Sequence, residues 1–184
     1  MPGNLTLDAL KAAVSRGEID TVLVAGVDMW GRLLGKRFHA AFFVNGGWEE
    51  THCCNYLLTV DQEMNTVQGY TSSSWQTGYG DYVLKPDMAT LRLVPWLEGT
   101  ALVLGDLLDH ATHAPVPHSP RAVLKKQVER ARAMGFEPMM ATELEFYLFA
   151  NSYESLRDNG TETSPRSAPI TRITTSSRRP RKKT

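Results

Sequence analysis

The feature that most limits how this chain can fold is the segment 141–149, which reads ATELEFYLF. It is rich in aromatic and aliphatic residues and contains no glycine or proline, a pattern that favours a β-strand. Side chains on a strand alternate between its two faces. One face of this strand is therefore apolar and the other carries two carboxylates: the first holds Leu144, Phe146 and Leu148, and the second holds Glu143, Glu145 and Tyr147.

The two adjacent carboxylates, Glu143 and Glu145, need a partner if this strand is buried. Burying one ionised carboxylate costs several kcal/mol, and a second negative charge beside it adds to that cost. Hard divalent ions such as Mg²⁺ and Mn²⁺ prefer carboxylate oxygens, so a bound metal ion would resolve the conflict. The alternative is an edge strand whose glutamate face lies in solvent.

The charge of the chain is unevenly distributed. Its formal net charge is zero, but residues 160–184 contain seven basic residues and one acidic residue. The rest of the chain therefore carries a net charge of −6. It offers no extended basic surface, so we expect no nucleic-acid partner.

Cysteine content and hydropathy favour a cytoplasmic location. Cys53 and Cys54 are the only cysteines and are adjacent, which suits a reducing compartment and not a structural disulfide. We identify no signal peptide, and no apolar run approaches the roughly 20 residues that span a bilayer. We therefore expect a cytoplasmic protein without a membrane partner.

The pattern of apolar and turn-forming residues in the first two thirds of the chain predicts a small, mostly antiparallel sheet preceded by one helix. Residues 5–14 have apolar side chains at helical spacing, and Thr6 is a candidate N-cap. Glycine, asparagine, aspartate and proline residues separate the short apolar runs that follow. The predicted strands are Thr21–Val27, Leu33–Phe38, Leu57–Val60, Tyr82–Leu84, Leu91–Val94 and Ala101–Leu104.

Prolines within residues 110–120 indicate a boundary or linker. After it, Ser119 is expected to cap a helix that has Pro120 at its first position and ends at Gly135. The apolar stripe of this helix consists of Val123, Leu124, Val128 and Ala131. The strand with the two glutamates follows.

Composition changes after Asp158. Residues 161–184 are rich in threonine, serine, proline and arginine and lack apolar periodicity. Such a segment buries too little to offset its ordering entropy, so we predict disorder. We interpret it as the end of a truncated or frame-shifted chain; the alternative is a basic interaction tail.

Several motifs, in one order and spacing, resemble the glutamine synthetase family over residues 18–158. Within the family, they are most similar to the branch that contains the γ-glutamylputrescine synthetases, which act in polyamine catabolism. The segments that carry the resemblance are GRLLGKR at 31–37, DYVLKPD at 81–87, LRLVPWLEGTALVLGD at 91–106, SPR at 119–121 and the Glu143–Glu145 pair. Leu34 stands where the family's G-x-x-R-G-K pattern has arginine.

This resemblance implies an α+β fold with a β-grasp-like N-terminal domain at residues 15–112. Residues 113–158 would be the truncated start of the catalytic domain, with its first helix and strand. Residues 159–184 would be the disordered basic tail, out of frame with the family sequence.

The resemblance also implies ATP-dependent joining of ammonia or an organic amine to the γ-carboxylate of glutamate. ATP phosphorylates that carboxylate, and the amine then attacks the γ-glutamyl phosphate. Metal ions, Mg²⁺ or Mn²⁺, neutralise charge on the phosphate oxygens, and Glu143 and Glu145 match their ligands. The remaining ligands and most nucleotide contacts of the family lie further along, so we expect this chain alone to be inactive; no catalytic residue is assigned.

A glycine-bounded loop at residues 69–80 occupies the place of the family loop that closes over amine and nucleotide. Ser73, Ser74 and Trp75 resemble its S-x-x-W portion. Members that use ammonia carry an aspartate there, and this sequence has none between Met64 and Gly80, which favours an organic amine. The alternative is a flexible surface loop without a ligand.

Family members share each active site between subunits, so the resemblance implies a homo-oligomer. Three hypotheses follow for the whole protein. It is a glutamate–amine ligase present as an N-terminal fragment, a non-catalytic relative that assembles with full-length subunits, or an unrelated α/β binding module. The order of the motifs argues against the third.

Overall fold

The computed structural model describes residues 3–143, 152, 154, 157 and 158. Short helical turns, labelled η, lie between several of the regular elements. In chain order the elements are α1 (Leu7–Ser15), β1 (Thr21–Val27), β2 (Leu33–His39), α2 (Ala40–Phe42), η1 (Phe43–Gly47), β3 (Thr51–Cys54), η2 (Asn55–Leu58), β4 (Asp81–Pro86), η3 (Met88–Thr90), β5 (Arg92–Leu93), β6 (Thr100–Asp109) and α3 (Pro120–Ala133).

The predicted cap of the first helix is confirmed. The side-chain oxygen of Thr6 accepts a hydrogen bond from the backbone N–H of Ala9 at 3.2 Å. This bond satisfies one of the donors that a helix leaves unpaired at its start. Leu10 and Ala13 are buried in the core, so the apolar stripe of α1 attaches the helix to the sheet.

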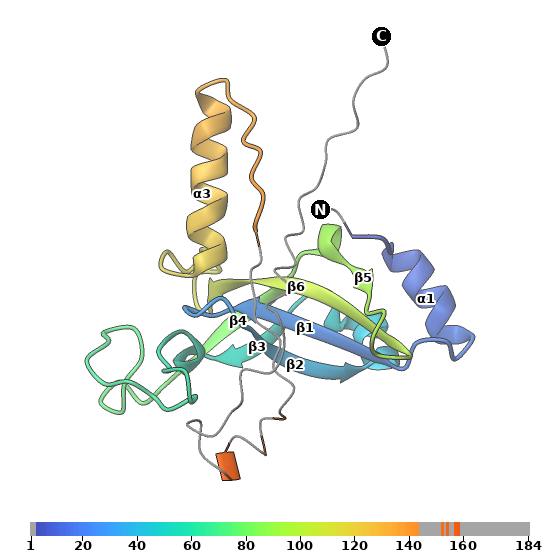
Figure 1. Cartoon of the computed structure of the whole chain (residues 1–184), viewed down its shortest axis with the longest axis horizontal. Helices are drawn as coiled ribbons and strands as arrows, with labels where there is room; N and C mark the ends of the chain where they lie inside the picture. The colour runs from blue at the N-terminus through green and yellow to red at the C-terminus, as the bar shows by residue number, and fades with distance from the viewer. Residues whose placement is uncertain (1–2, 144–151, 153, 155–156, 159–184) are drawn as a thin grey trace, which may run out of the picture. The chain divides into compact units, whose positions relative to one another are not determined.

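Within the described residues, a six-stranded sheet has the order β2-β1-β6-β4-β3, and β5 pairs with β6 outside this path. Figure 1 shows β6 running along the middle of the sheet with β1 beside it. β1 and β6 are parallel, whereas the other pairs are antiparallel. A parallel pair needs a long crossover, and here residues 28–99 provide it. The sheet is therefore mixed, and the β-grasp assignment stays a prediction.

The core lies on one face of this sheet. Val22 and Val24 of β1 are fully buried, and Leu23 between them is only partly buried, as the alternation of a strand requires. Val103 of β6 pairs in register with Val24, so both side chains enter the same core. Other large residues that are fully or almost fully buried include Leu10, Phe43, Leu58, Leu84 and Leu91.

The predicted strand at Leu57–Val60 is wrong, because η2 is a 3-10 helix that includes its first two residues. Leu58 and Val60 are buried, but the chain turns between them. The carbonyl of Tyr56 accepts hydrogen bonds from both the backbone N–H and the hydroxyl of Thr59, at 2.7 and 3.1 Å. Such local bonds compete with sheet pairing, and a short apolar run does not by itself distinguish the two structures.

The proline-rich segment 110–120 packs on the sheet and is not a free linker. Val116 is buried, and its N–H donates to the carbonyl of Leu107 in β6 at 2.9 Å. Pro115 forms an isolated bridge with Leu108. Prolines indicate where a helix or strand ends. They do not indicate whether the segment that contains them packs on a neighbouring strand.

Helix α3 has the predicted start at Pro120, but the predicted side-chain cap is absent. Ser119 is buried and makes no side-chain cap hydrogen bond. Its N–H instead donates to the carbonyl of Val116 at 3.0 Å, which ties the start of the helix to the buried segment before it. The predicted apolar stripe is largely exposed, and no residue of α3 is buried.

The chain divides into two compact units, residues 1–137 and 138–184. Helix α3 therefore belongs to the first unit, whereas the sequence places a boundary at residue 112 or 113. Residues 138–143 of the second unit contain no helix or strand, although the predicted glutamate strand begins at Ala141. Residues 144–149 of that prediction lie outside the described residues, and so does the proposed tail at 159–184. The family domain limits stay predictions.

Candidate functional site

The predicted substrate loop is a folded segment between η2 and β4. The N–H of Ser74 donates to the hydroxyl of Thr77 at 3.1 Å, and the N–H of Thr77 donates to the hydroxyl of Ser74 at 3.2 Å. The hydroxyl of Thr59 donates to that of Ser73 at 3.3 Å. Ser73 and Ser74 are buried, whereas Trp75 is 73% exposed. The two serines therefore stabilise the loop through hydrogen bonds. Trp75 is the one of the three predicted loop residues that a ligand can reach.

Trp75 belongs to a row of three rings, Tyr56, Tyr79 and Trp75, which we call the aromatic ledge. The Trp75 and Tyr79 ring centroids lie 5.3 Å apart with an interplanar angle of 75°. Tyr79 and Tyr56 lie 6.2 Å apart at 85°. Sequence analysis singled out Trp75 and missed both tyrosines. The signal for Tyr79 was its place between two glycines, Gly78 and Gly80.

 Hydrogen bonds from Asn55 in η2 hold this loop at two places. The N–H of Asn55 donates to the carbonyl of Gly80 at 2.8 Å, and its side-chain amide donates to the carbonyl of Ser72 at 3.1 Å. Asn55 therefore joins the two ends of the loop. Its Oδ1 is buried and has no hydrogen-bond partner among the described residues.

Asp28 and Arg32 fasten residues 61 and 62, which precede the loop, to the turn between β1 and β2. Asp28 is buried and accepts hydrogen bonds from the N–H groups of Trp30 and Arg32, and its other oxygen pairs with the Arg32 guanidinium at 2.7 Å. The guanidinium also donates to the carbonyls of Asp61 and Gln62. Burial opposes ionisation of Asp28, but these hydrogen bonds outweigh it and hold the pKa of the carboxyl below its ordinary value.

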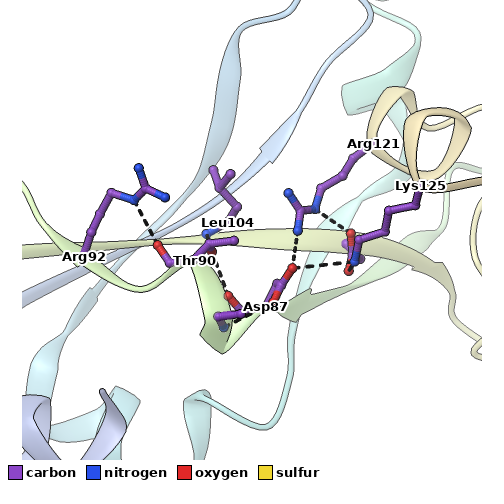
Figure 2. Close-up of polar contacts among 8 residues, drawn as sticks. Asp87, Thr90, Arg92, Leu104, Arg121 and Lys125 are labelled. Atoms are coloured by element: carbon purple, nitrogen blue, oxygen red, sulfur yellow. Dashed lines mark hydrogen bonds and ion pairs between the residues drawn. The ribbon is translucent and has the colours of Figure 1, made fainter. Parts of the chain in front are cut away.

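A second polar cluster joins α3 to the sheet and unites residues from three of the family-like segments. Figure 2 shows Arg121 and Lys125 of α3 reaching toward Asp87. Arg121 pairs with Asp87 and with Asp106 of β6, the latter at 2.7 Å, and Lys125 pairs with Asp106 at 2.5 Å. Two cations thus balance two carboxylates, so this cluster is a structural anchor.

The predicted metal ligands are only partly within the described residues. Glu143 is exposed and lies outside any helix or strand, and Glu145 lies outside the described residues. Among the residues that the structure describes, no group of three histidine, cysteine, aspartate or glutamate side chains could hold a metal ion. The metal assignment of Glu143 and Glu145 therefore stays a prediction.

Cys53 and Cys54 are both free thiols. Burial raises the pKa of the Cys53 thiol to about 11, so this residue is a poor nucleophile at neutral pH. In the described part of the chain, no helix is long and apolar enough to cross a membrane.

Residues 117–183 match the family described as "Glutamine synthetase, catalytic domain". The matched range includes most of the basic segment 159–184, which the sequence analysis sets apart from the family. The chain is 48% identical over 155 residues to "Gamma-glutamylethanolamide synthetase GlnA4" of Streptomyces coelicolor, covering 84% of this chain and 33% of that protein. It is 38% identical over 144 residues to "Glutamate--isopropylamine ligase" of a Pseudomonas species, covering 78% of this chain and 31% of that protein.

Among solved structures, the chain resembles "Crystal structure of novel glutamine synthase homolog" with a TM-score of 0.54. That likeness has 18% identity and covers 78% of this chain and 36% of the other. "Apo GmaS without ligand" gives a TM-score of 0.52 at 19% identity, covering 70% and 27% of the two chains. These likenesses support the fold alone. The chain spans about a third of the length of the curated relatives described above.

Proposed function

This chain belongs to the glutamine synthetase family, and we propose that it forms the N-terminal part of an ATP-dependent ligase that joins an amine to the γ-carboxylate of glutamate. The observation that carries this proposal is the 48% identity to a γ-glutamylethanolamide synthetase over 84% of the chain. The Pseudomonas relative, by its name a glutamate–isopropylamine ligase, supports the same reaction class.

The proposed reaction has two steps. The γ-carboxylate of glutamate attacks the terminal phosphorus of ATP, which releases ADP and forms γ-glutamyl phosphate. The neutral amine then attacks the acyl carbon, phosphate leaves, and the nitrogen loses a proton to give the γ-glutamyl amide. Both steps depend on positioning and on neutralising phosphate charge.

We propose an organic amine, and not ammonia, as the second substrate. The loop at residues 69–80 contains no aspartate, and its exposed side chains include Trp75. The names of the two relatives, which refer to ethanolamine and isopropylamine derivatives, support this choice. Polyamines, which the γ-glutamylputrescine synthetase branch of the family uses, are further candidate amines.

Mg²⁺ or Mn²⁺ is part of the proposal, with Glu143 and Glu145 as its ligands in this chain. Carboxylate oxygens suit such hard ions, and the side chain of Glu143 is exposed.

 Such an ion would supply charge neutralisation at the phosphate oxygens. The two glutamates alone are an incomplete donor set, so the remaining ligands must come from elsewhere in the complete protein.

We further propose a cytoplasmic homo-oligomer whose active sites are shared between subunits. The free thiols Cys53 and Cys54 support a reducing compartment. The chain alone is expected to be inactive, because it spans about a third of the length of its relatives and the remaining metal ligands and most nucleotide contacts of the family lie further along. The same observation supports an alternative, in which the chain is a non-catalytic relative that assembles with full-length subunits.

The test measures phosphate release that depends on ATP, glutamate and amine in two proteins. The first is the 184-residue chain. The second is a chimera that joins residues 1–143 of this chain to the remainder of the Streptomyces relative. We expect no turnover from the chain alone and Mg²⁺-dependent turnover from the chimera, faster with ethanolamine or isopropylamine than with ammonium.

Glu143→Gln in the chimera tests the metal assignment, because the amide keeps the shape of the side chain and removes its charge. We expect weaker Mn²⁺ binding and a lower rate, whereas the matched variant Glu137→Gln should change neither. A folded chimera that is inactive with every amine would contradict the proposed function. Turnover by the chain alone would contradict its expected inactivity.

A further inference from the structure

An apolar groove lies between α1 and the turn that joins β5 to β6. Its volume is about 440 Å³, within the range of about 300–1,000 Å³ that is typical of ligand pockets. Figure 1 shows α1 and β5 at the same end of the sheet. The apolar residues that line the groove include Ala9 and Ala13 of α1, Ile19, Val94, Pro95 and Leu97. The groove is therefore large enough to receive an aromatic side chain.

Hydrogen bonds fix both walls of this groove. The side-chain oxygen of Asn4, which precedes α1, accepts a hydrogen bond from the N–H of Leu93 at 3.1 Å. On the other side, the N–H of Asp20 donates to the carbonyl of Gly99 at 3.0 Å. The groove is thus formed before a partner binds, and binding to it costs little ordering of the backbone.

The charges at the groove favour an apolar occupant. Arg16 and Glu18 line it, and their side chains pair with each other at 2.7 Å. Glu98 is the other charged residue among the described lining residues, so the lining has no unbalanced positive charge. A nucleotide or another anion is therefore disfavoured, whereas an apolar side chain gains from burial against apolar walls.

A side chain that suits this groove lies on the neighbouring turn. Trp96 stands between Pro95 and Leu97 and is 78% exposed. The N–H of Leu97 donates to the carbonyl of Val94 at 3.1 Å, which closes the turn around Trp96. Leu93 and Leu97 are also exposed. Exposed apolar patches often mark protein interfaces, and tryptophan is enriched among the residues that dominate binding there.

We propose that α1 and the β5–β6 turn form an interface between two copies of this chain, in which each copy inserts Trp96 into the groove of the other. A two-fold interface requires one self-complementary patch. Here the inserting side chain and the receiving groove belong to the same patch, because the residues on both sides of Trp96 line the groove. A second copy of the chain therefore fills both grooves and covers both tryptophans at once.

This interface is separate from the candidate site. The groove lies where β6 begins at Thr100, whereas the substrate loop leads into β4, whose Tyr82 pairs with Asp109 at the other end of β6. The 10 residues of β6 span about 30 Å. The inference is therefore independent of the proposed function, and the contact does not cover the substrate loop.

The buried area predicts a weak dimer. A tryptophan buries about 200 Å², so two of them and the groove walls that they cover remove about 800 Å² from water. Stable interfaces bury at least about 1,200 Å². We therefore expect a dissociation constant in the micromolar range, and an association that depends on protein concentration.

Sedimentation velocity of the 184-residue chain, at concentrations from micromolar to millimolar, tests this inference. We expect a shift from monomer to dimer as the concentration rises. Trp96→Ser should weaken the association by about 30-fold, the loss that is typical when a dominant interface residue is removed. Trp75→Ser is the matched control, because Trp75 is similarly exposed but lies in the substrate loop. Circular dichroism of each variant shows whether the fold is retained.

A second variant fills the groove and keeps Trp96. Ala9 is an exposed residue of α1, and Ala9→Arg places a long side chain in the groove while keeping a good helix former. It should weaken the association as Trp96→Ser does. A mixture of the two variants should associate more strongly than either alone, because one copy keeps an open groove and the other keeps the tryptophan.

Three results would overturn the inference: a chain that is monomeric at every concentration, a dimer that survives both variants, or equal weakening by Trp75→Ser. The second would place self-association on another exposed apolar surface, such as Val123 and Leu124 of α3. A mixture that associates no more strongly than its two components would contradict the reciprocal insertion of Trp96.

Discussion

At the scale of single residues, Asp28 links local sequence to the candidate site. Its carboxylate orders the turn between β1 and β2, and through Arg32 it fixes the carbonyls of Asp61 and Gln62 in the segment that leads into the substrate loop. A buried carboxylate is tolerated only when its hydrogen bonds are satisfied. Asp28 meets this condition with partners from its own turn, so loss of its charge should affect both the turn and the loop.

Asp28→Asn should lower the free energy of unfolding at pH 7 by about 2 kcal/mol, the scale of a hydrogen bond to a charged group. The pKa of Asp28 is held below its ordinary value, so its stabilising effect is present above that value and is lost as pH falls through the folded-state pKa. The difference in unfolding free energy between the variant and the unchanged chain should therefore be smaller at acidic pH. Urea unfolding at pH 7 and at about pH 3 measures it.

The matched control is Glu49→Gln, which neutralises an exposed carboxylate. It should leave the unfolding free energy within about 0.5 kcal/mol of the unchanged chain. A deficit for Asp28→Asn that is equal at both pH values would show that packing, and not charge, explains the loss.

At the scale of elements, α3 is joined to the sheet mainly by ion pairs. No residue of the helix is buried, and Val123 and Leu124 are about half exposed at 46% and 49%. Arg121 is only 18% exposed and pairs with the carboxylates of Asp87 and Asp106. The helix therefore depends on a few charged contacts near its start, and this dependence could not be inferred from its apolar stripe.

Arg121→Gln should release α3 without unfolding the sheet. The neutral amide replaces only part of the two charge-assisted contacts, so amide exchange in residues 123–133 should become about 10-fold faster. Hydrogen exchange followed by mass spectrometry resolves this segment from β1 and β6. Arg130→Gln, at an exposed position in the same helix, is the control and should change exchange little. Equal acceleration in the sheet would contradict a local role.

At the scale of the whole molecule, the limits of the first unit differ from those that composition predicts. The proline-rich segment 110–120 is held by Val116, whereas residues 138–143 lack helix and strand. The first unit thus ends after Glu137 and includes α3. Prolines indicate where a helix or strand ends, but they do not show whether the segment is exposed. The burial of its side chains decides whether it is a flexible linker or part of the packed unit.

Brief digestion with thermolysin should therefore cut between residues 135 and 143 before it cuts between 110 and 118. Phe136, Met139 and Met140 are 64%, 90% and 79% exposed and offer the apolar side chains that this protease prefers. Mass spectrometry of the early fragments locates the cuts. Replacing Met139 and Met140 with serine should slow cleavage there, and an early cut within 110–118 would contradict the assignment of α3 to the first unit.

The sequence by itself determined the features that depend on neighbouring residues. The bounds of the predicted strand Thr21–Val27 match β1, and Thr6 caps α1 as predicted. Helix capping and short apolar runs depend on a few neighbouring residues, so a short window of sequence is enough to predict them. The family motifs likewise identified the family, because their order along the chain is a property of sequence.

Only the tertiary structure decided which distant segments meet. It paired β1 with β6 in parallel and brought Arg121 to Asp87 and Asp106. It also buried Ser73 and Ser74 while leaving Trp75 exposed beside Tyr79. These outcomes depend on which surfaces pack together across tens of residues. Distant segments compete for burial and for hydrogen-bond partners, and a short window of sequence does not show which of them will meet.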